Sequence, residues 1–423
     1  MAQSEQVFNE STGRQEDVGQ LLRAYLGPRS IAFRSIFQYA NFNEMQSIVA
    51  KTLLTSTENV VIASPTGSGK TDCFSLSIVK LFMESFGQDG PCTGIKPKVV
   101  YLAPTKSLVQ ERTASWQSVF QPLNFDVMEL SSDSLDTEGE DYEHRIAEVD
   151  IICSTPEKFD AITRRSTGKH FSSKVSQAKK NLVKSIRLLL IDEIHLLGDK
   201  RGSVLEAVIA RMLFLKESSK RDPSSMIGNM RTIGLSATFP NIADVGQWLK
   251  CPPAHVFSFG PSFRPVPLTV RFHTVDEWSN SNDYLWDKNL KLKTFGVIKE
   301  NSIGRPVLIF LGTRAGVSQQ AKQIFDVCDN FFLRAGSHDE QQERREQLDM
   351  IAKDIESEDL KKYVRKGVAF HHAGLSIVDR RLVENGYVEG FIQCLCCTST
   401  LAMGINLPAH MVVIVNTKVY RGG

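Results

Sequence analysis

The sequence has little that would assign the protein to a membrane or a secreted class. The first twenty residues, MAQSEQVFNESTGRQEDVGQ, are polar and lack the apolar core of a signal peptide. No apolar run approaches the roughly 20 residues that a membrane-spanning helix needs. We therefore expect a soluble, intracellular protein with no membrane partner.

Paired cysteines are also absent. The eight cysteines show no paired CxxC motifs and most lie in apolar runs, which is typical of reduced, buried thiols. The cluster CLCC at residues 394–397 raises a metal site as an alternative. However, β-strand alternation places Cys394 and Cys396 on one face and Cys397 on the other. We expect these three side chains to pack in a core.

Neither sign of charge is in clear excess. The 50 Lys and Arg residues and 48 Asp and Glu residues give a net charge of +2, which neither requires nor excludes a nucleic acid partner. There is also no low-complexity tract and no solenoid repeat. A length of 423 residues with 42% apolar residues is typical of two or three globular domains.

One pattern recurs along the chain: a short apolar run, then small or polar residues, then a helix-like stretch. Apolar runs without alternation predict strands that are buried on both faces of a parallel sheet. In such α/β folds the ligands bind beyond the carboxyl ends of the strands. The pattern is found in NVVIASPTGSGKT, KVVYLAPTKSL, VDIICSTPEKF, IRLLLIDEIHLL and RTIGLSATFP, and again in RPVLIFLGTRAG, GVAFHHAGL, IQCLCCTSTLAMG and HMVVIVNT.

The pattern divides the chain into two blocks. We expect a polar N-terminal extension over residues 1–29, a first α/β lobe over 30–255 and a second lobe over 290–423. Between the lobes, residues 256–289 begin with a proline-rich stretch that breaks regular structure and predicts a connector.

The segment SPTGSGKT has the context of a phosphate-binding loop, because a predicted strand precedes it and a helix-like segment follows it. Gly67 and Gly69 allow backbone N–H groups to turn toward phosphates at the amino end of that helix. Lys70 would reach the β- and γ-phosphates, and Thr71 would bind Mg²⁺. The alternative is a glycine-rich turn that merely precedes a lysine, which the flanking strand and helix disfavour. The predicted ATP-binding residues of this loop are Ser64, Pro65, Thr66, Gly67, Ser68, Gly69, Lys70 and Thr71.

Asp192 and Glu193 end another apolar run, in LLLIDEIH. Asp192 can hold Mg²⁺, directly or through water, and Glu193 can polarise an attacking water. A carboxylate pair at the end of a buried strand is costly without a compensating cation. An acidic cap for the following helix is the alternative, but it does not explain the phosphate-binding loop. Lys70, Asp192 and Glu193 are therefore the predicted catalytic residues of a nucleoside triphosphate site.

Beyond these two motifs, the sequence resembles the superfamily-two DExH-box helicases. DEIH, LSAT, APTKSLVQER, STPEKFD and FNEMQS resemble motifs of the first lobe of that family. VLIFLGTRAG, FHHAGL and TSTLAMGINLPAH resemble motifs of the second lobe. The resemblance implies two RecA-like lobes with ATP between them, and a nucleic acid strand lying across both.

Longer segments resemble the superkiller-type branch of these helicases. RGSVLEAVIARM, FRPVPLTV and FHHAGLSIVDRRLVENGYVEG carry this resemblance, and FNEMQS with TPEKFDAITRR is most similar to the meiotic crossover type. That type implies an ATP-dependent DNA helicase of meiotic recombination, located in the nucleus, with single-stranded or partly duplex DNA as partner. An RNA helicase of the same branch stays open, because nothing identifies a reader of the 2′-hydroxyl. A non-catalytic nucleic-acid or protein clamp also stays open, although the intact catalytic residues disfavour it.

The resemblance assigns roles to further residues. Gln46 is the implied adenine contact, while Gly404 and Asn406 are implied nucleotide or inter-lobe contacts. The residues implied to couple hydrolysis to lobe movement are His195, Ser236, Ala237 and Thr238. Contacts to phosphate and sugar position a strand without reading its sequence. The implied backbone contacts are Pro104, Thr105, Lys106, Thr155 and Pro156 in the first lobe, and Thr313, Arg314 and Thr398 in the second.

The sequence ends at Gly423, before any segment of the type QxxGRAGR. In helicases of this kind that segment, motif VI, brings arginines to the ATP site from the second lobe. Arginine fingers contribute about 10³–10⁵ in rate in related sites. We therefore expect residues 1–423 to bind Mg-ATP but to hydrolyse it poorly and not to unwind a duplex. Alternatively, Gly423 ends a fragment, a splice form or an incomplete gene model of a working helicase.

Overall fold

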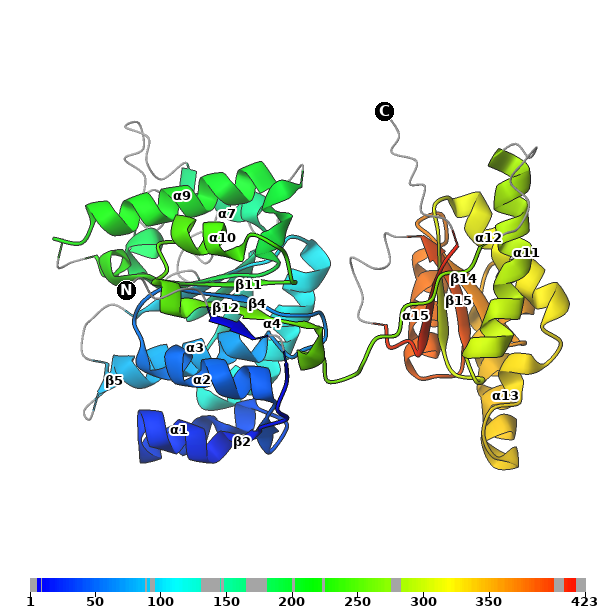
Figure 1. Cartoon of the computed structure of the whole chain (residues 1–423), viewed down its shortest axis with the longest axis horizontal. Helices are drawn as coiled ribbons and strands as arrows, with labels where there is room; N and C mark the ends of the chain where they lie inside the picture. Colours follow the sequence, from blue (N-terminus) through cyan, green and yellow to red (C-terminus); the bar gives the residue numbers. More distant parts are fainter. Residues whose placement is uncertain are drawn as a thin grey trace. The chain divides into compact units, whose positions relative to one another are not determined.

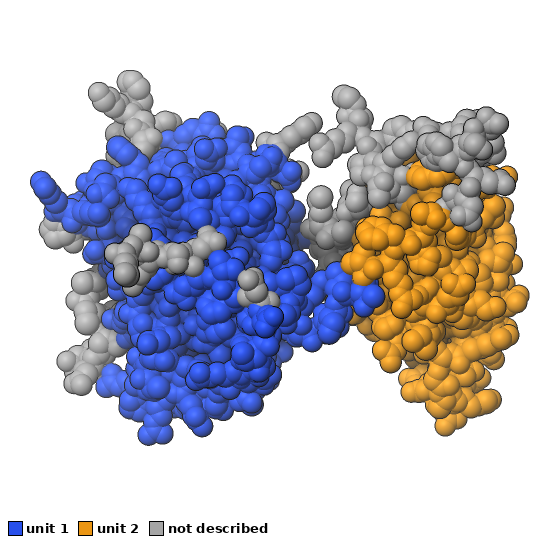
Figure 2. Space-filling model, viewed as in Figure 1, with its two compact units in different colours: residues 1–269 blue, residues 270–423 orange. Residues whose placement is uncertain are grey.

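The structure is a computed structural model of the chain. It describes residues 6–8, 10–87, 90–91, 96–130, 145, 148–164, 181–199, 202–222, 225–274, 283–398 and 407–415. The chain divides into two compact units, residues 1–269 and 270–423 (Figure 2). Within the described residues no helix is both long enough and apolar enough to cross a bilayer.

Unit 1 is built on an eight-stranded sheet in the order β1-β12-β4-β11-β10-β7-β9-β8. Every neighbouring pair of strands is parallel. The strands are β1 (Gln6–Phe8), β4 (Val60–Ala63), β7 (Lys98–Leu102), β8 (Val127–Glu129), β9 (Ile151–Ser154), β10 (Ile186–Ile191), β11 (Arg231–Ser236) and β12 (Val256–Phe259).

Helices cover both faces of this sheet (Figure 1). Val60 and Ile62 of β4 belong to one core and Val61 and Ala63 to another, because successive side chains of a strand point to opposite faces. The helices of the first core are α1 (Val18–Leu26), α2 (Glu44–Thr55), α3 (Asp72–Ser85) and α4 (Lys106–Phe120). Those of the second are α7 (Pro156–Arg164), α9 (Gly202–Ser218) and α10 (Ile242–Trp248). The prediction of unbroken apolar runs as doubly covered parallel strands is confirmed for β4, β7, β9, β10 and β11.

The strand order decides where a ligand can bind. The chain passes from β4 to β7 over two intervening positions, and β10 and β11 later fill those positions. The polar segments that follow β4, β11, β10 and β7 therefore meet at one edge of the sheet, although up to 173 residues separate them in sequence. A change of direction in the strand order is the usual place for a ligand in an open α/β sheet.

The N-terminal segment differs from the predicted polar extension. β1 pairs with β12, with Gln6 opposite Phe257, and extends the sheet at its edge. In α1 the side chains of Val18, Leu21 and Leu22 are buried. Their spacing of i, i+3 and i+4 forms an apolar helix face, and the polar average composition of residues 1–29 conceals this face.

The connector also starts later than predicted. Residues 256–259 form β12, which pairs with β4 inside the sheet of unit 1, and the division between the units falls after Thr269. The cause is a short aromatic run, VFSF, in which Phe257 and Phe259 are buried in the same core as α2 and α3. Prolines on both sides of this run made it resemble a linker.

Unit 2 contains a second parallel sheet, in the order β14-β15-β13-β16. Its strands are β13 (Val307–Leu311), β14 (Val368–His371), β15 (Cys394–Thr398) and β16 (Met411–Ile414). Its helices are α11 (Asp283–Asn301), α12 (Arg314–Val327), α13 (His338–Asp354), α14 (Glu358–Val364) and α15 (Ile377–Val388). Cys394, Cys396 and Cys397 are fully buried in its core, as predicted.

Candidate active site

The phosphate-binding loop occupies residues 64–71, between β4 and α3. Gly67 and Gly69 have φ values of 81° and 75°, in the left-handed region that favours glycine. The Lys70 Nζ atom donates hydrogen bonds to the carbonyl oxygens of Ser64 and Pro65, at 2.9 and 3.1 Å. The Ser64 hydroxyl donates to the Ser68 hydroxyl at 2.8 Å. The loop thus has the positive-φ glycines and the inward-facing lysine of a phosphate cradle. Thr66 is exposed, and Thr71 is half-buried immediately before α3.

The capping box of α2 is hydrogen-bonded to this loop. Asn43 and Gln46 cap the amino end of α2 through reciprocal hydrogen bonds of 3.0 Å. The same two side chains donate from Asn43 Nδ2 to the Ser68 carbonyl at 2.9 Å, and from Gln46 Nε2 to the Gly69 carbonyl at 3.0 Å. The start of α2 and the phosphate-binding loop are therefore one hydrogen-bonded unit.

Gln46, the predicted adenine contact, lies beside the phosphate-binding loop. The residue is only 2% exposed, and both ends of its side-chain amide are hydrogen-bonded within the protein. Its Nε2 atom also lies 3.1 Å from Tyr39 Oη and from Asp72 Oδ2. In this structure Gln46 supports the loop, and contact with a base would require these bonds to rearrange.

A matched pair of glycine substitutions tests this support. A Cβ atom on Gly69 would lie 2.7 Å from Gln46 Nε2, whereas a Cβ atom on Gly67 would meet nothing within 4 Å. Both substitutions impose a left-handed strain of about 1–2 kcal/mol, but only Gly69→Ala also displaces Gln46. We expect Gly69→Ala to lower nucleotide affinity about tenfold or more, as 1.4 kcal/mol is tenfold, and Gly67→Ala to lower it less. Titration with a fluorescent ADP measures both, and equal losses would contradict a supporting role for Gln46.

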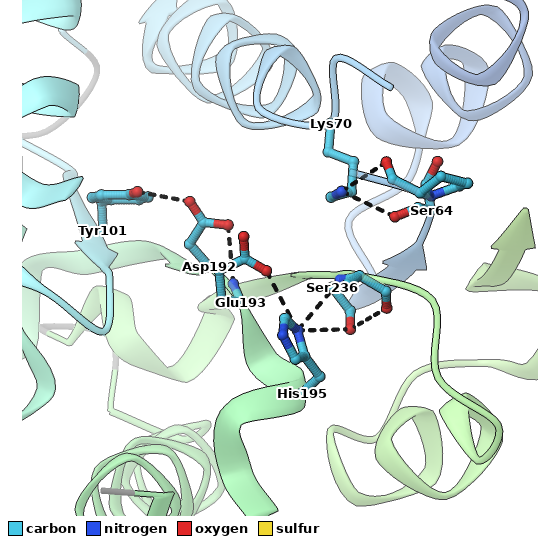
Figure 3. A network of polar contacts seen from close by, with 9 residues as sticks. Ser64, Lys70, Tyr101, Asp192, Glu193, His195 and Ser236 are labelled. Atoms are coloured by element: carbon cyan, nitrogen blue, oxygen red, sulfur yellow. Dashed lines mark hydrogen bonds and ion pairs between the residues drawn. The ribbon is translucent and has the colours of Figure 1, made fainter. Parts of the chain in front are cut away.

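The carboxylates of Asp192 and Glu193 follow β10 directly, at the same edge of the sheet (Figure 3). The Asp192 N–H donates to the Leu102 carbonyl at 2.9 Å, which continues the ladder between β10 and β7. Glu193 has φ 50° and ψ 45°, a left-handed conformation that is uncommon for a residue with a long side chain. Such conformations cluster at functional sites, where the surrounding structure holds them in place.

Lys70 and the two carboxylates influence one another electrostatically. In Figure 3 the Lys70 amine is bonded on the Ser64 side of the site and Asp192 on the Tyr101 side. Burial lowers the pKa of Lys70, while the charges of Glu193 and Asp192 oppose this shift. Burial and the charge of Asp192 raise the pKa of Glu193, and Lys70 opposes that shift. A raised carboxylate pKa brings Glu193 closer to the range in which a side chain can accept a proton from water.

His195 connects the carboxylate pair to the segment after β11. Its Nδ1 atom accepts from the Ala237 N–H at 3.3 Å and lies 3.4 Å from the Ser236 hydroxyl. Burial and the charge of Lys70 lower the pKa of His195, which favours the neutral ring. The contact of 3.3 Å between Nδ1 and Glu193 Oε2 is therefore not an ion pair. Ser236 in turn accepts from the Ser64 N–H at 3.1 Å.

These contacts bring together three of the four predicted coupling residues: His195, Ser236 and Ala237. Together they link the phosphate-binding loop to Glu193 through backbone and side-chain contacts. Thr238 is exposed at the same edge.

The predicted nucleic-acid contacts of unit 1 follow β7 and β9. Thr105 caps α4, since its hydroxyl accepts from the Leu108 N–H at 3.3 Å, and Lys106 is exposed in the first turn. Pro104 and Thr155 are half-buried. Pro156 is buried as the first residue of α7.

Unit 2 repeats the local arrangement of Thr105. Thr313 caps α12, accepts from the Gly316 N–H at 3.0 Å and has φ −134° and ψ 150°, beside φ −131° and ψ 149° for Thr105. Arg314 is exposed in the first turn of α12, and Thr398 ends the neighbouring strand β15. The two units therefore present equivalent threonines at equivalent strand ends. Gly404 and Asn406 lie outside the residues that the structure describes.

Tyr101 also belongs to the site, although it was not predicted from the sequence. The Tyr101 hydroxyl donates to Asp192 Oδ2 at 2.8 Å across 91 residues of sequence. A single polar group inside the apolar run KVVYL, close to the end of a strand, was the available signal.

Comparison with known proteins agrees with this geometry. Residues 43–245 match the DEAD/DEAH box helicase family. The chain is 37% identical over 394 residues to the ATP-dependent DNA helicase homolog MER3 of Arabidopsis thaliana. The aligned region covers 91% of this chain and 33% of that protein. It is 36% identical to the ATP-dependent DNA helicase MER3 of Saccharomyces cerevisiae, over 92% of this chain and 29% of that protein.

A ribonucleoprotein helicase is also similar. The chain is 35% identical over 394 residues to the U5 small nuclear ribonucleoprotein 200 kDa helicase of Caenorhabditis elegans, over 90% of this chain and 17% of that protein. The chain thus spans a third or less of the length of these curated relatives. The phosphate-binding loop, the Asp192–Glu193 pair and the segment after β11 all lie within residues 43–245, and this part of the chain is a DEAD/DEAH box helicase domain.

Proposed function

We propose that this chain binds ATP with Mg²⁺ and hydrolyses it as the motor part of an ATP-dependent DNA helicase. The observation that carries the proposal is the position of Lys70 and of the Asp192–Glu193 carboxylates. They lie at the carboxyl ends of β4 and β10 and are linked through the β11 segment between them. A cation for phosphates and two carboxylates for metal and water are the parts that phosphoryl transfer to water requires.

The donor atoms suit a magnesium ion. Mg²⁺ prefers hard oxygen ligands and is usually held by one or two protein groups together with phosphates. The Thr71 hydroxyl and the Asp192 carboxylate are the oxygen donors that would hold it. When bound, the ion supplies positive charge to the phosphate oxygens.

Each protein group then has a defined task. Lys70 and the loop N–H groups bind the phosphates, and Glu193 accepts a proton from the attacking water. His195 presents a neutral ring to Ser236 and Ala237, so a change at the phosphate end of the site can reach the segment after β11. Ser236, Ala237 and Thr238 remain the candidates for coupling, and Gly404 and Asn406 remain candidates for nucleotide or inter-lobe contacts.

We propose DNA as the nucleic acid. The Arabidopsis and yeast relatives are named as DNA helicases, and the resemblance to the meiotic crossover type favours a nuclear role in meiotic recombination. Thr105, Lys106 and Thr155 in unit 1 and Thr313, Arg314 and Thr398 in unit 2 are the proposed backbone contacts. The similarity to the U5 helicase supports RNA as the second candidate.

A charge substitution with a matched control tests the nucleic acid proposal. Lys106 is exposed beside the cap of α4, and Lys51 is exposed on α2. We expect Lys106→Ala to weaken single-stranded DNA binding several-fold and to lower the salt slope by about 0.7, the value for one phosphate contact on a single strand. Lys51→Ala should change neither quantity.

The same titrations distinguish the two nucleic acids. We expect single-stranded DNA to stimulate single-turnover ATP hydrolysis more strongly than RNA of the same length. Stronger stimulation by RNA would replace DNA with RNA as the substrate. Equal affinity for nucleic acid with and without ATP, unchanged by Lys70→Ala and Glu193→Gln, would favour a non-catalytic clamp.

A further inference from the structure

Tyr101 lies beside the proposed metal ligand and has no assigned role. Its side chain is on β7, is 1% exposed and belongs to the core beneath α3 and α4. The ring packs edge-on against Phe74 at 5.8 Å and Trp116 at 5.2 Å between centroids. Aromatic neighbours on both sides fix the ring plane, so the hydroxyl has a defined position.

That hydroxyl meets one oxygen of the Asp192 carboxylate. Tyr101 donates to Asp192 Oδ2 at 2.8 Å, and the backbone N–H of Glu193 donates to Oδ1 of the same carboxylate at 3.0 Å. The Tyr101 hydroxyl is therefore a hydrogen-bond donor to this carboxylate, which can only accept. Both oxygens of Asp192 are therefore held by a fixed donor, and each keeps further lone pairs.

The register of the sheet shows which way this bond directs Asp192. Tyr101 pairs with Leu190 across β7 and β10, and both belong to the core that α3 covers. A bond from Tyr101 therefore holds the Asp192 side chain toward the face of the sheet on which α3 lies. Thr71, the other proposed ligand, immediately precedes α3. Both proposed ligands therefore belong to the α3 side of the sheet.

We propose that Tyr101 is a positioning residue, whose hydroxyl holds the Asp192 carboxylate in the orientation that binds the magnesium ion of Mg-ATP. This inference rests on the proposed function. Partners that orient a metal-binding side chain typically change metal affinity 10–100-fold when they are removed.

Tyr101→Phe removes this hydroxyl and keeps the ring between Phe74 and Trp116. We expect it to raise the Mg²⁺ concentration at half-saturation of ADP binding about tenfold or more. The affinity for ADP in the presence of EDTA should not change, because the loop and Lys70 bind the phosphates. Fluorescent ADP, titrated with Mg²⁺ on the full chain, gives both quantities without any turnover.

The matched control is Tyr387→Phe in unit 2. Tyr387 is equally buried, at 1% exposed, but its hydroxyl has no hydrogen-bond partner within the described residues. Tyr387→Phe should leave the magnesium midpoint unchanged.

The possible outcomes distinguish a failure of the Tyr101 inference from a failure of the proposed Mg-ATP site. If Tyr101→Phe lowers the unfolding temperature but has the same magnesium midpoint as the wild type, Tyr101 is only structural and the inference is wrong. If Tyr101→Phe weakens ADP binding equally with Mg²⁺ and with EDTA, the effect acts on the loop and the inference is also wrong. If the wild type itself binds ADP without any dependence on Mg²⁺, the proposed magnesium site fails, and with it the inference.

Discussion

Glu193→Gln is expected to lower single-turnover ATP hydrolysis by about 10²–10⁴-fold, the usual contribution of a positioned acid or base. The amide keeps the size and the hydrogen-bonding atoms of the side chain but cannot accept a proton from water. Lys70, Thr71 and Asp192 are unchanged, so the affinity for Mg-ATP should stay within a few-fold of wild type, which is about 1 kcal/mol or less. Rapid-quench measurements with protein in excess over ATP give the rate even where turnover is slow.

The pH dependence of this variant provides an internal control. Burial and the charge of Asp192 raise the pKa of Glu193, so wild-type hydrolysis should fall as the pH drops through that raised value. Glutamine removes this acid limb from the pH profile. A variant with near wild-type rate and the same acid limb would mean that Glu193 does not receive the proton.

Stability should change in the opposite direction to activity. The folded chain holds a proton on Glu193 more tightly than the unfolded chain does, because the folded-state pKa is raised. Ionised Glu193 therefore lowers the free energy of unfolding at pH 7, and this penalty disappears at a pH below the ordinary glutamate value. We expect Glu193→Gln to unfold at a higher temperature than wild type at pH 7 and at the same temperature in acid.

Lys70→Ala is expected to weaken ATP binding about 10- to 100-fold. A hydrogen bond to a charged group contributes about 1.5–3 kcal/mol, and Lys70 is the cation at the head of the phosphate-binding loop. Saturating ATP raises the unfolding temperature of a protein that binds it in the folded state. With ATP at about ten times the wild-type Kd, this shift should be present in the wild type and in Lys51→Ala and much smaller in Lys70→Ala. An unchanged shift in Lys70→Ala would show that ATP binds elsewhere.

The parts of this molecule that the sequence predicted are those with local causes. Positive φ at Gly67 and Gly69 follows from the demands of a tight loop, and the carboxylates end β10 because a charged pair cannot continue a buried strand. The parallel sheets follow from apolar runs that lack alternation. Each of these features depends on about ten consecutive residues, the length over which hydrophobic periodicity is informative.

The parts that were missed depend on contacts between distant segments. In the sequence, Tyr101 is part of an apolar run and nothing marks it as functional. Only the fold brings its hydroxyl to Asp192, 91 residues away. The direction of the Gln46 amide depends on Gly69 and Asp72, which a motif match does not encode. β1 and β12 are short segments that become strands through pairing with distant parts of the chain, β12 with β4 and β1 with β12.

The most direct test of the central claim is a calorimetric titration of the purified chain with ATP, with Mg²⁺ and with EDTA. The account predicts one site per chain, tighter binding with Mg²⁺, and loss of most of that affinity in Lys70→Ala. A chain that shows no affinity for magnesium nucleotide, or that binds it equally well without Lys70, would contradict the assignment of this site.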